Sequence, residues 1–113
     1  MNLQPGKLLR LYVNEHDQYE GRPLYEALVD CCRELRVAGA TAFRALEGFG
    51  ESAELHRHHV FGGDESIVIT IVESREKAQE ILPILQVMMN SGLIAVTDVD
   101  VTVISKGVPT ALT

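Results

Sequence analysis

Hydrophobic and polar residues alternate along four stretches of this chain, and two stretches of helical spacing lie between them. The alternation predicts strands at residues 7–13 (KLLRLYV), 40–47 (ATAFRALE), 66–73 (SIVITIVE) and 93–104 (LIAVTDVDVTVI). Between the first and second strands, and again between the third and fourth, apolar residues recur every three to four positions, as in amphipathic helices. The predicted order is therefore strand, helix, strand, strand, helix, strand.

Both predicted helices have recognisable ends. The first covers residues 23–37, with Pro23 suited to the first helical position and Gly39 able to form the C-terminal stop. The second begins after Ser74, a residue type that caps helix N-termini well. Pro83 lies inside the second helix and removes a backbone hydrogen bond, so we expect a kink there.

The element order predicts an α+β fold, a ferredoxin-like βαββαβ sandwich with an antiparallel sheet and two helices on one face. The third strand is apolar on both sides, with Ile67, Ile69 and Ile71 on one and Val68 and Val72 on the other. Two helices can cover only one face, which leaves the second apolar face open within one chain. We therefore expect an oligomer in which sheet faces pack together.

Length and composition set further bounds. A chain of 113 residues has room for a single domain, and residues 1–6 and 105–113 are expected to be a flexible N-terminus and a C-terminal tail. A net charge of −6 without any basic run argues against nucleic-acid binding. Apolar runs are too short to span a membrane and no signal-peptide pattern is seen, so a cytoplasmic protein without membrane insertion is expected.

A long polar segment follows the second predicted strand and begins with two glycines around an aromatic residue, Gly48-Phe49-Gly50. Glycine permits backbone conformations that other residues avoid and lets a ligand approach the main chain. A flexible hairpin tip would have the same composition, so the motif by itself does not decide between the two. We expect a long loop at residues 48–65, and the sequence leaves open whether it is ordered without a ligand.

Five short motifs occur in order along nearly the whole chain: LRLYV at 9–13, YEGRPLYEAL at 19–28, EGFG at 47–50, LPIL at 82–85 and GLI at 92–94. In these motifs the chain resembles an uncharacterised bacterial and archaeal family that is grouped with the PII-like proteins. The resemblance implies a compact homotrimer and a signalling function. PII proteins bind adenine nucleotides or related effectors between subunits and regulate a partner protein through the loop that corresponds to residues 48–65.

The resemblance assigns a place in the ligand cleft to Gly48, Phe49 and Gly50, because a G-x-G stretch at the base of the PII loop helps to shape that cleft. One PII feature is missing. PII proteins hold nucleotide phosphates with a second glycine-rich loop before the last strand, and here only Asn90-Ser91-Gly92 stand in that position. We therefore expect a small, adenine-nucleotide-like effector that is not a triphosphate bound in the PII manner.

Two arginines are well placed to bind an anionic effector, Arg44 just before the loop and Arg57 within it. Each is equally suited to an ion pair between subunits, with the acids Glu47, Glu51 or Glu54 as partners. After the first strand, Glu15 and Asp17 could hydrogen-bond a ribose or cap a turn, and the capping role is the favoured interpretation.

Histidines in the same loop raise the question of a metal. In an extended chain, His56 and His58 point the same way and could share a metal ion with a carboxylate such as Glu54 or Asp64. No spaced cysteine set accompanies them, so a polar, partly solvated arm is the favoured interpretation and no metal cofactor is expected. Cys31 and Cys32 are adjacent within a helical pattern, and whether they are redox-active is left open.

Catalytic motifs are not recognised: no serine lies in a G-x-S-x-G sequence and neither cysteine has an identifiable acid–base partner, so an enzyme is not expected. The prediction is a PII-like sensor that binds a small effector at subunit clefts and regulates a protein partner. The alternatives are a ligand-independent oligomeric interaction module and a metal-binding trimer that uses His56 and His58.

Overall fold

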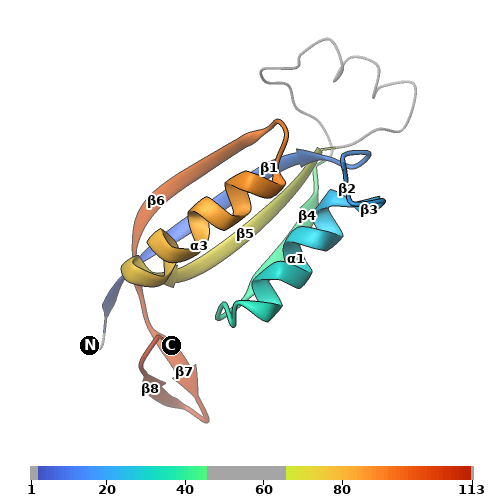
Figure 1. Ribbon diagram of the computed structural model, residues 1–113. Coiled ribbons are helices and arrows are strands. Elements are labelled where there is room, and N and C mark those ends of the chain that lie inside the picture. Colours follow the sequence, from blue (N-terminus) through green and yellow to red (C-terminus); the bar gives the residue numbers. More distant parts are fainter. Residues whose placement is uncertain (1–2, 46–65, 113) are drawn as a thin grey trace.

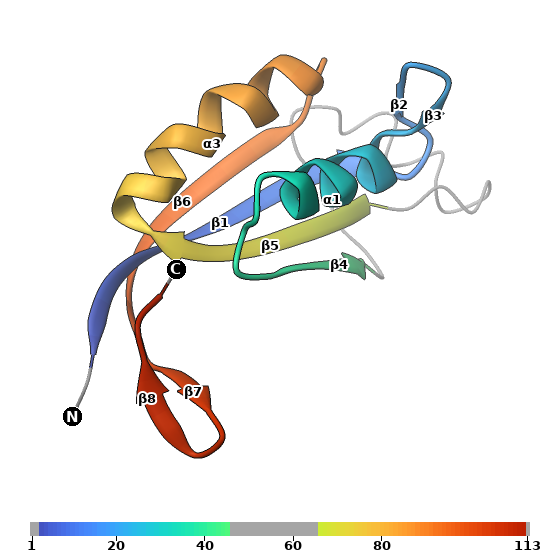
Figure 2. The same ribbon diagram turned by 60° about the horizontal axis from the view of Figure 1, so that its bottom comes forward.

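A computed structural model of the protein describes residues 3–45 and 66–112. Four strands form an antiparallel sheet in the order β4 (Ala40–Arg44), β5 (Ser66–Ser74), β1 (Gln4–Asn14) and β6 (Leu93–Val101). The helices α1 (Leu24–Glu34) and α3 (Arg75–Met88) lie on the same face of this sheet (Figures 1 and 2). This arrangement is the ferredoxin-like sandwich that the element order predicts.

Strand β1 lies in the middle of the sheet and fixes its register. It pairs antiparallel with β5 on one side and with β6 on the other, so that Leu11 lies opposite both Ile69 and Ile94. Directly opposed residues of neighbouring strands point to the same face of a sheet. Alternate residues of β1 and β5 therefore face the two helices together.

The hydrophobic core fills the space between the helices and this face of the sheet. Its members are almost completely removed from water: Leu9, Leu11, Val13, Leu24, Leu28, Cys32, Ile67, Ile69, Ile71, Ala78, Ile81 and Leu85. The strand residues among them are the ones that alternation places on one side of the first and third predicted strands. The periodic pattern thus identifies the core correctly.

The opposite face of the sheet lies away from both helices. It carries the half-buried side chains of Tyr12 and Leu8 in β1, opposite Val68 and Val72 in β5. Phe43 of β4 also lies on this face, opposite Val68, and is 54% exposed. We call these five residues the open sheet face. Its apolar character agrees with the expectation from the two-sided third strand.

The ends of β1 and of the chain differ from the sequence-based expectation. Strand β1 begins at Gln4, so part of the segment expected to be a flexible N-terminus belongs to the sheet. In place of a loose C-terminal tail, β7 (Val103–Ser105) pairs with β8 (Val108–Thr110) in a hairpin. Both residues of its turn, Lys106 and Gly107, have positive φ, which matches the twist of paired strands.

The C-terminal residues are fastened to the first strand by the Gln4 side chain. Its Nε2 donates a hydrogen bond to the Thr110 carbonyl oxygen at 2.8 Å, and its Oε1 accepts one from the Leu112 amide at 3.0 Å. Leu112 itself is buried. The Gln4 side chain therefore provides two hydrogen bonds to the C-terminal backbone, as the backbone of a paired strand would.

The helix ends were predicted with mixed success. Ser74 caps α3 as expected, with its Oγ accepting a hydrogen bond from the Lys77 amide at 3.2 Å. Pro83 lies within α3, which runs on to Met88. Pro23 is the residue before α1 instead of its first helical residue, and α1 ends at Glu34, short of the predicted end at residue 37.

A buried carboxylate joins three elements at the far end of β5. Glu73 is fully buried, and its Oε2 accepts a hydrogen bond from the Ala38 amide at 2.6 Å, in the connection between α1 and β4. Its Oε1 accepts a second bond from the Ser74 amide at 3.0 Å, where α3 begins. Hydrogen bonding compensates the cost of burying a carboxylate here.

Candidate ligand-binding site

Several strand ends meet at one end of the sheet (Figure 1). Asn14, the last residue of β1, lies opposite Ser66, the first residue of β5. Tyr12 lies opposite Leu93, the first residue of β6. Strand β4 ends beside the start of β5 at Arg44, one of the two predicted anion-binding residues. The fold therefore brings Arg44 to the end of the sheet where β1 ends and β6 begins, with β5 and β1 lying between β4 and β6.

Arg44 makes an ion pair across the sheet. Its Nη1 lies 2.5 Å from Oε1 of Glu15, and the two side chains are 48% and 22% exposed respectively. The sequence offers Glu47, Glu51 or Glu54 as partners of Arg44 between subunits, and these three residues lie outside the part of the chain that the structure describes. It did not indicate Glu15, because the two residues come together only through the strand order β4-β5-β1.

Glu15 is presented by a tightly bonded turn between β1 and β2 (Gln18–Tyr19). The Asn14 amide donates to Asp17 Oδ2 at 2.9 Å, and the Asp17 amide donates back to the Asn14 carbonyl at 3.0 Å. The Asp17 carbonyl accepts a bond from the Leu24 amide at 2.8 Å, at the start of α1. The expected capping role of Asp17 is thus confirmed, and the backbone of Glu15 is held relative to α1.

The connection between α3 and β6 passes tightly against β1. Gly92 has φ +121°, and a Cβ atom at this position would lie 2.4 Å from the Tyr12 carbonyl oxygen. A side chain cannot be accommodated there without moving the backbone of β1. Because α3 ends at Met88 and β6 begins at Leu93, this connection is too short for a second glycine-rich loop of the PII type, as the sequence indicated.

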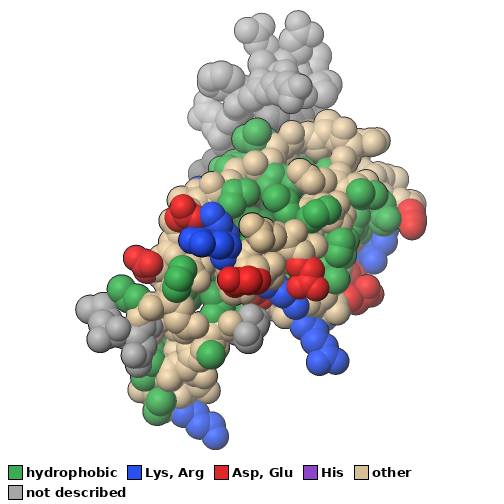
Figure 3. All heavy atoms as spheres, turned by 60° about the vertical axis from the view of Figure 1, so that its left-hand side comes forward, with side chains coloured by type: hydrophobic (Ala, Val, Ile, Leu, Met, Phe, Trp, Pro, Cys, Tyr) green, Lys and Arg blue, Asp and Glu red, His purple; other side chains and the backbone are tan. Residues whose placement is uncertain are grey.

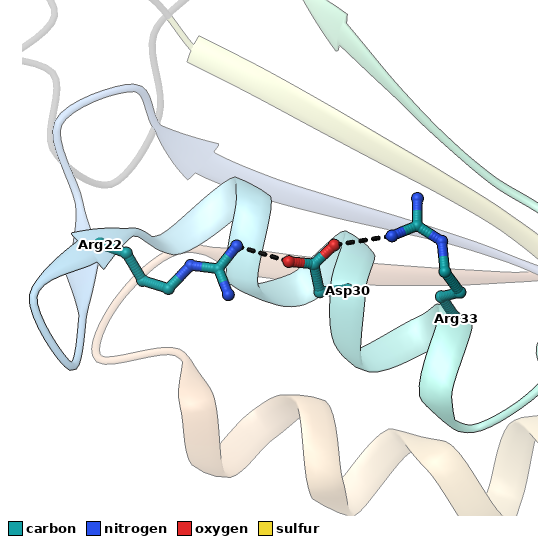
Figure 4. Close-up of polar contacts among 3 residues, drawn as sticks. All are labelled: Arg22, Asp30 and Arg33. Atoms are coloured by element: carbon teal, nitrogen blue, oxygen red, sulfur yellow. Dashed lines mark hydrogen bonds and ion pairs between the residues drawn. The ribbon is translucent and has the colours of Figure 1, made fainter.

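A second charged group lies on the surface of α1. Asp30 Oδ2 lies 2.5 Å from Nη2 of Arg22, and Asp30 Oδ1 lies 2.9 Å from Nη1 of Arg33, so that both guanidinium groups point toward one carboxylate (Figure 4). The hydrogen bond from Arg22 lowers the pKa of Asp30, and the same bond raises the pKa of Arg22. The contact holds β3 (Arg22–Pro23), which pairs with β2, against α1. We interpret this group as structural.

The two cysteines of α1 are poor nucleophiles in this structure. Cys32 is 1% exposed, and burial raises the pKa of its thiol to about 11. Burial also raises the pKa of Cys31, which is partly exposed. Because the thiolate is the reactive form, both side chains remain largely unreactive thiols near neutral pH.

Most of the predicted site residues lie outside the part of the chain that the structure describes: Gly48, Phe49, Gly50, His56, Arg57 and His58. Within residues 3–45 and 66–112, no group of three or more His, Cys, Asp or Glu side chains is arranged to hold a metal ion. In the same ranges, no helix has the length and apolar character needed to cross a membrane.

Comparison with known proteins identifies the family. Residues 6–101 match DUF190, which is described as an uncharacterized ACR family. The chain belongs to the DUF190 family. A UPF0166 protein of Aquifex aeolicus (strain VF5) is 35% identical over 103 residues, which cover 89% of this DUF190 chain and 97% of the relative. A UPF0166 protein of Methanocaldococcus jannaschii is 29% identical over 98 residues, with coverage of 82% and 88%.

Solved structures of CPII from Thiomonas intermedia K12 have the same fold as this DUF190 chain. One, bound to ADP, AMP and acetate, gives a TM-score of 0.55 at 21% identity and covers 89% of this chain and 92% of CPII. Another, bound to ADP and bicarbonate, gives a TM-score of 0.52 at 23% identity, with coverage of 88% and 91%. The likeness confirms the PII-like architecture that the sequence motifs indicated.

Proposed function

We propose that this DUF190 protein is a PII-like sensor that binds a small anionic effector of the adenine-nucleotide class at the sheet end around Arg44. The observation that carries the proposal is the position of Arg44. Its side chain is half-exposed, and its backbone is held at the end of β4 by pairing with the start of β5. The adenine nucleotides bound to CPII, which has the same fold, support this ligand class.

The open sheet face supports self-association, and we propose a homotrimer as the functional unit. In a single chain this face leaves Phe43, Tyr12 and their apolar neighbours partly in contact with water. Packing the faces of several copies together would bury that surface, which is the main driving force for association. Other apolar side chains also reach the surface, as Figure 3 shows for one side of the molecule. Subunit clefts in such an assembly are where we place the effector.

The short connection before β6 limits what the effector can be. Without a second glycine-rich loop, the phosphates of the ligand are left to Arg44 and to the predicted residues Arg57 and Gly48-Phe49-Gly50. We therefore propose a mono- or diphosphate as the effector, in preference to a triphosphate. The loop at residues 48–65 is proposed to report the ligand to a protein partner, with binding and no catalysis as the function.

Thermal unfolding with a ligand panel tests the proposal, because a ligand that binds only the folded state raises its apparent stability. We expect AMP or ADP to raise the melting temperature of the intact protein, since a ligand at a hundred times its Kd stabilises by about 2.7 kcal/mol. The variant Arg44→Gln should lose this shift. Arg33→Gln, which removes an exposed guanidinium from α1, should keep it.

One outcome of the thermal unfolding experiment would contradict the proposal. If the protein forms a trimer and no adenine nucleotide, cyclic ones included, changes its melting temperature, the sensor function is wrong. A partner complex whose affinity ignores added metabolites would then identify a ligand-independent interaction module.

A further inference from the structure

The ion pair between Glu15 and Arg44 differs from the other described ion pairs in the burial of its carboxylate. The carboxylates of Asp98 and Asp30, which pair with lysine or arginine elsewhere, are 78% and 40% exposed, whereas Glu15 is only 22% exposed. A carboxylate withdrawn from water interacts more strongly with a cation at its side than an exposed one does. Arg44 nevertheless keeps 48% of its side-chain surface open to solvent.

Backbone hydrogen bonds support both partners of this pair. Glu15 stands in the turn that the mutual bonds of Asn14 and Asp17 close. On the other side, the Ala45 amide donates to the Ser66 carbonyl at 2.8 Å and holds the end of β4 against β5. The carboxylate is thus held where an anionic ligand of Arg44 would place its own oxygen atoms.

We propose that Glu15 is the specificity-determining residue of the Arg44 site, an internal anion that an external phosphate or carboxylate must displace. The inference rests on the proposed function, because it describes how that site selects its ligand. Glu15 neutralises Arg44 in the unliganded protein and repels each negative charge of an incoming ligand. The site therefore discriminates against highly charged anions, which is selection by an unfavourable contact.

Displacement of Glu15 by a ligand also has a structural effect. While Glu15 is bound to Arg44, the ion pair links β4 to the turn that is bonded to the start of α1 through Asp17 and Leu24. A ligand that takes the place of Glu15 releases this link. Binding at the end of the sheet is then coupled to the connection between β1 and α1.

Calorimetric titration of the full chain with ADP, AMP and adenosine tests the inference. The variant Glu15→Gln keeps the size of the side chain and removes its charge. We expect it to bind ADP on the order of tenfold more tightly than the wild type, a typical coupling between two binding events. AMP should gain less, and adenosine, which carries no phosphate, should not change. The double variant Glu15→Gln with Arg44→Gln should lose the gain.

Asp98→Asn is the matched control, because it removes one carboxylate charge from an ion pair with Lys7, away from this end of the sheet. It should leave all affinities as they are. Equal or weaker binding of ADP by Glu15→Gln, relative to the wild type, overturns the inference while the proposed function stands. Binding of ADP by Glu15→Gln alone would overturn the proposed function of the wild type, and the inference, which rests on that function, would fail with it. If neither protein binds, both fail.

Discussion

At the scale of single residues, Gly92 is constrained by both its own backbone and a neighbouring strand. Its φ of +121° is unfavourable for any residue with a side chain, and a Cβ would lie 2.4 Å from the Tyr12 carbonyl oxygen. We predict that Gly92→Ala lowers the free energy of unfolding by about 3 kcal/mol, from strain and steric overlap together. Urea unfolding followed by circular dichroism, at a fixed protein concentration, measures the change.

Two other glycines separate the contributions to that loss. Gly107 has φ +79° and open space around it. Gly107→Ala should therefore lower the free energy of unfolding by about 1 kcal/mol, from the unfavourable backbone conformation alone. Gly39 has open space and needs no positive φ, and Gly39→Ala should be nearly neutral. If all three alanine variants lose the same stability, the proposed contact with Tyr12 is wrong.

Single residues also mark the limit of what the sequence could predict about the site. Arg44 was identified because it precedes the predicted loop. Its partner Glu15 is placed only near a turn by the sequence. The pairing depends on β5 lying between β4 and β1, and a linear pattern does not give the order of strands in the sheet. The core leucines and isoleucines were predictable because strand periodicity depends on neighbours in the sequence.

At the scale of elements, Glu73 of β5 joins the connection between α1 and β4 to the start of α3 through hydrogen bonds from the Ala38 and Ser74 amides. Replacing it with alanine leaves the Ala38 amide without this acceptor, so we predict that Glu73→Ala lowers the unfolding free energy by about 2 kcal/mol. Glu73→Gln keeps one acceptor oxygen and should lose less. Urea unfolding gives both values, and hydrogen exchange at the Ala38 amide locates the effect.

Glu76 provides the control for Glu73, because it is an acid in the first turn of α3 that remains exposed. Removing it affects only the interaction with the helix dipole, so Glu76→Ala should cost a few tenths of a kcal/mol. A loss for Glu73→Ala no larger than this would mean that the buried carboxylate does not fasten the connection between α1 and β4.

The elements themselves were predicted better than their ends, and two cases show why. Gln4-Pro5-Gly6 has the composition of a turn, yet β1 begins there. Pro5 is tolerated because, among the described strands, β6 alone pairs with this part of β1, and the pairing with β5 begins at Gly6. The hairpin of β7 and β8 escaped prediction because its strands are three residues long and its Lys-Gly turn lacks the usual Asn-Gly signal.

At the scale of the whole molecule, the open sheet face determines the proposed assembly. Phe43 is an exposed aromatic on this face, and a charge in its place would have to be buried when copies pack together. We predict that Phe43→Asp shifts the protein from trimer to monomer. Light scattering coupled to size-exclusion chromatography measures the mass directly.

Val87 offers a matched substitution outside this face. It is 83% exposed on α3, on the opposite side of the sheet, so Val87→Asp should leave the mass of the assembly unchanged. A Phe43→Asp protein that stays trimeric would show that the copies associate through another surface. The sequence could predict which end of the sheet carries the candidate site, because the fold class determines where each strand ends. It could not predict how copies pack together, because hydrophobic periodicity does not describe the surfaces that meet.

The position of β1 also bears on how the chain is made. On the ribosome β1 emerges before both of its neighbours in the sheet, because β5 and β6 belong to the second half of the chain. At about 5–20 residues per second, the nascent chain carries β1 unpaired for several seconds before β5 appears. A fragment that stops before Ser66 has β1 and β4 but lacks the strand that lies between them. Such a fragment cannot build this sheet, so folding must wait for the second half of the chain.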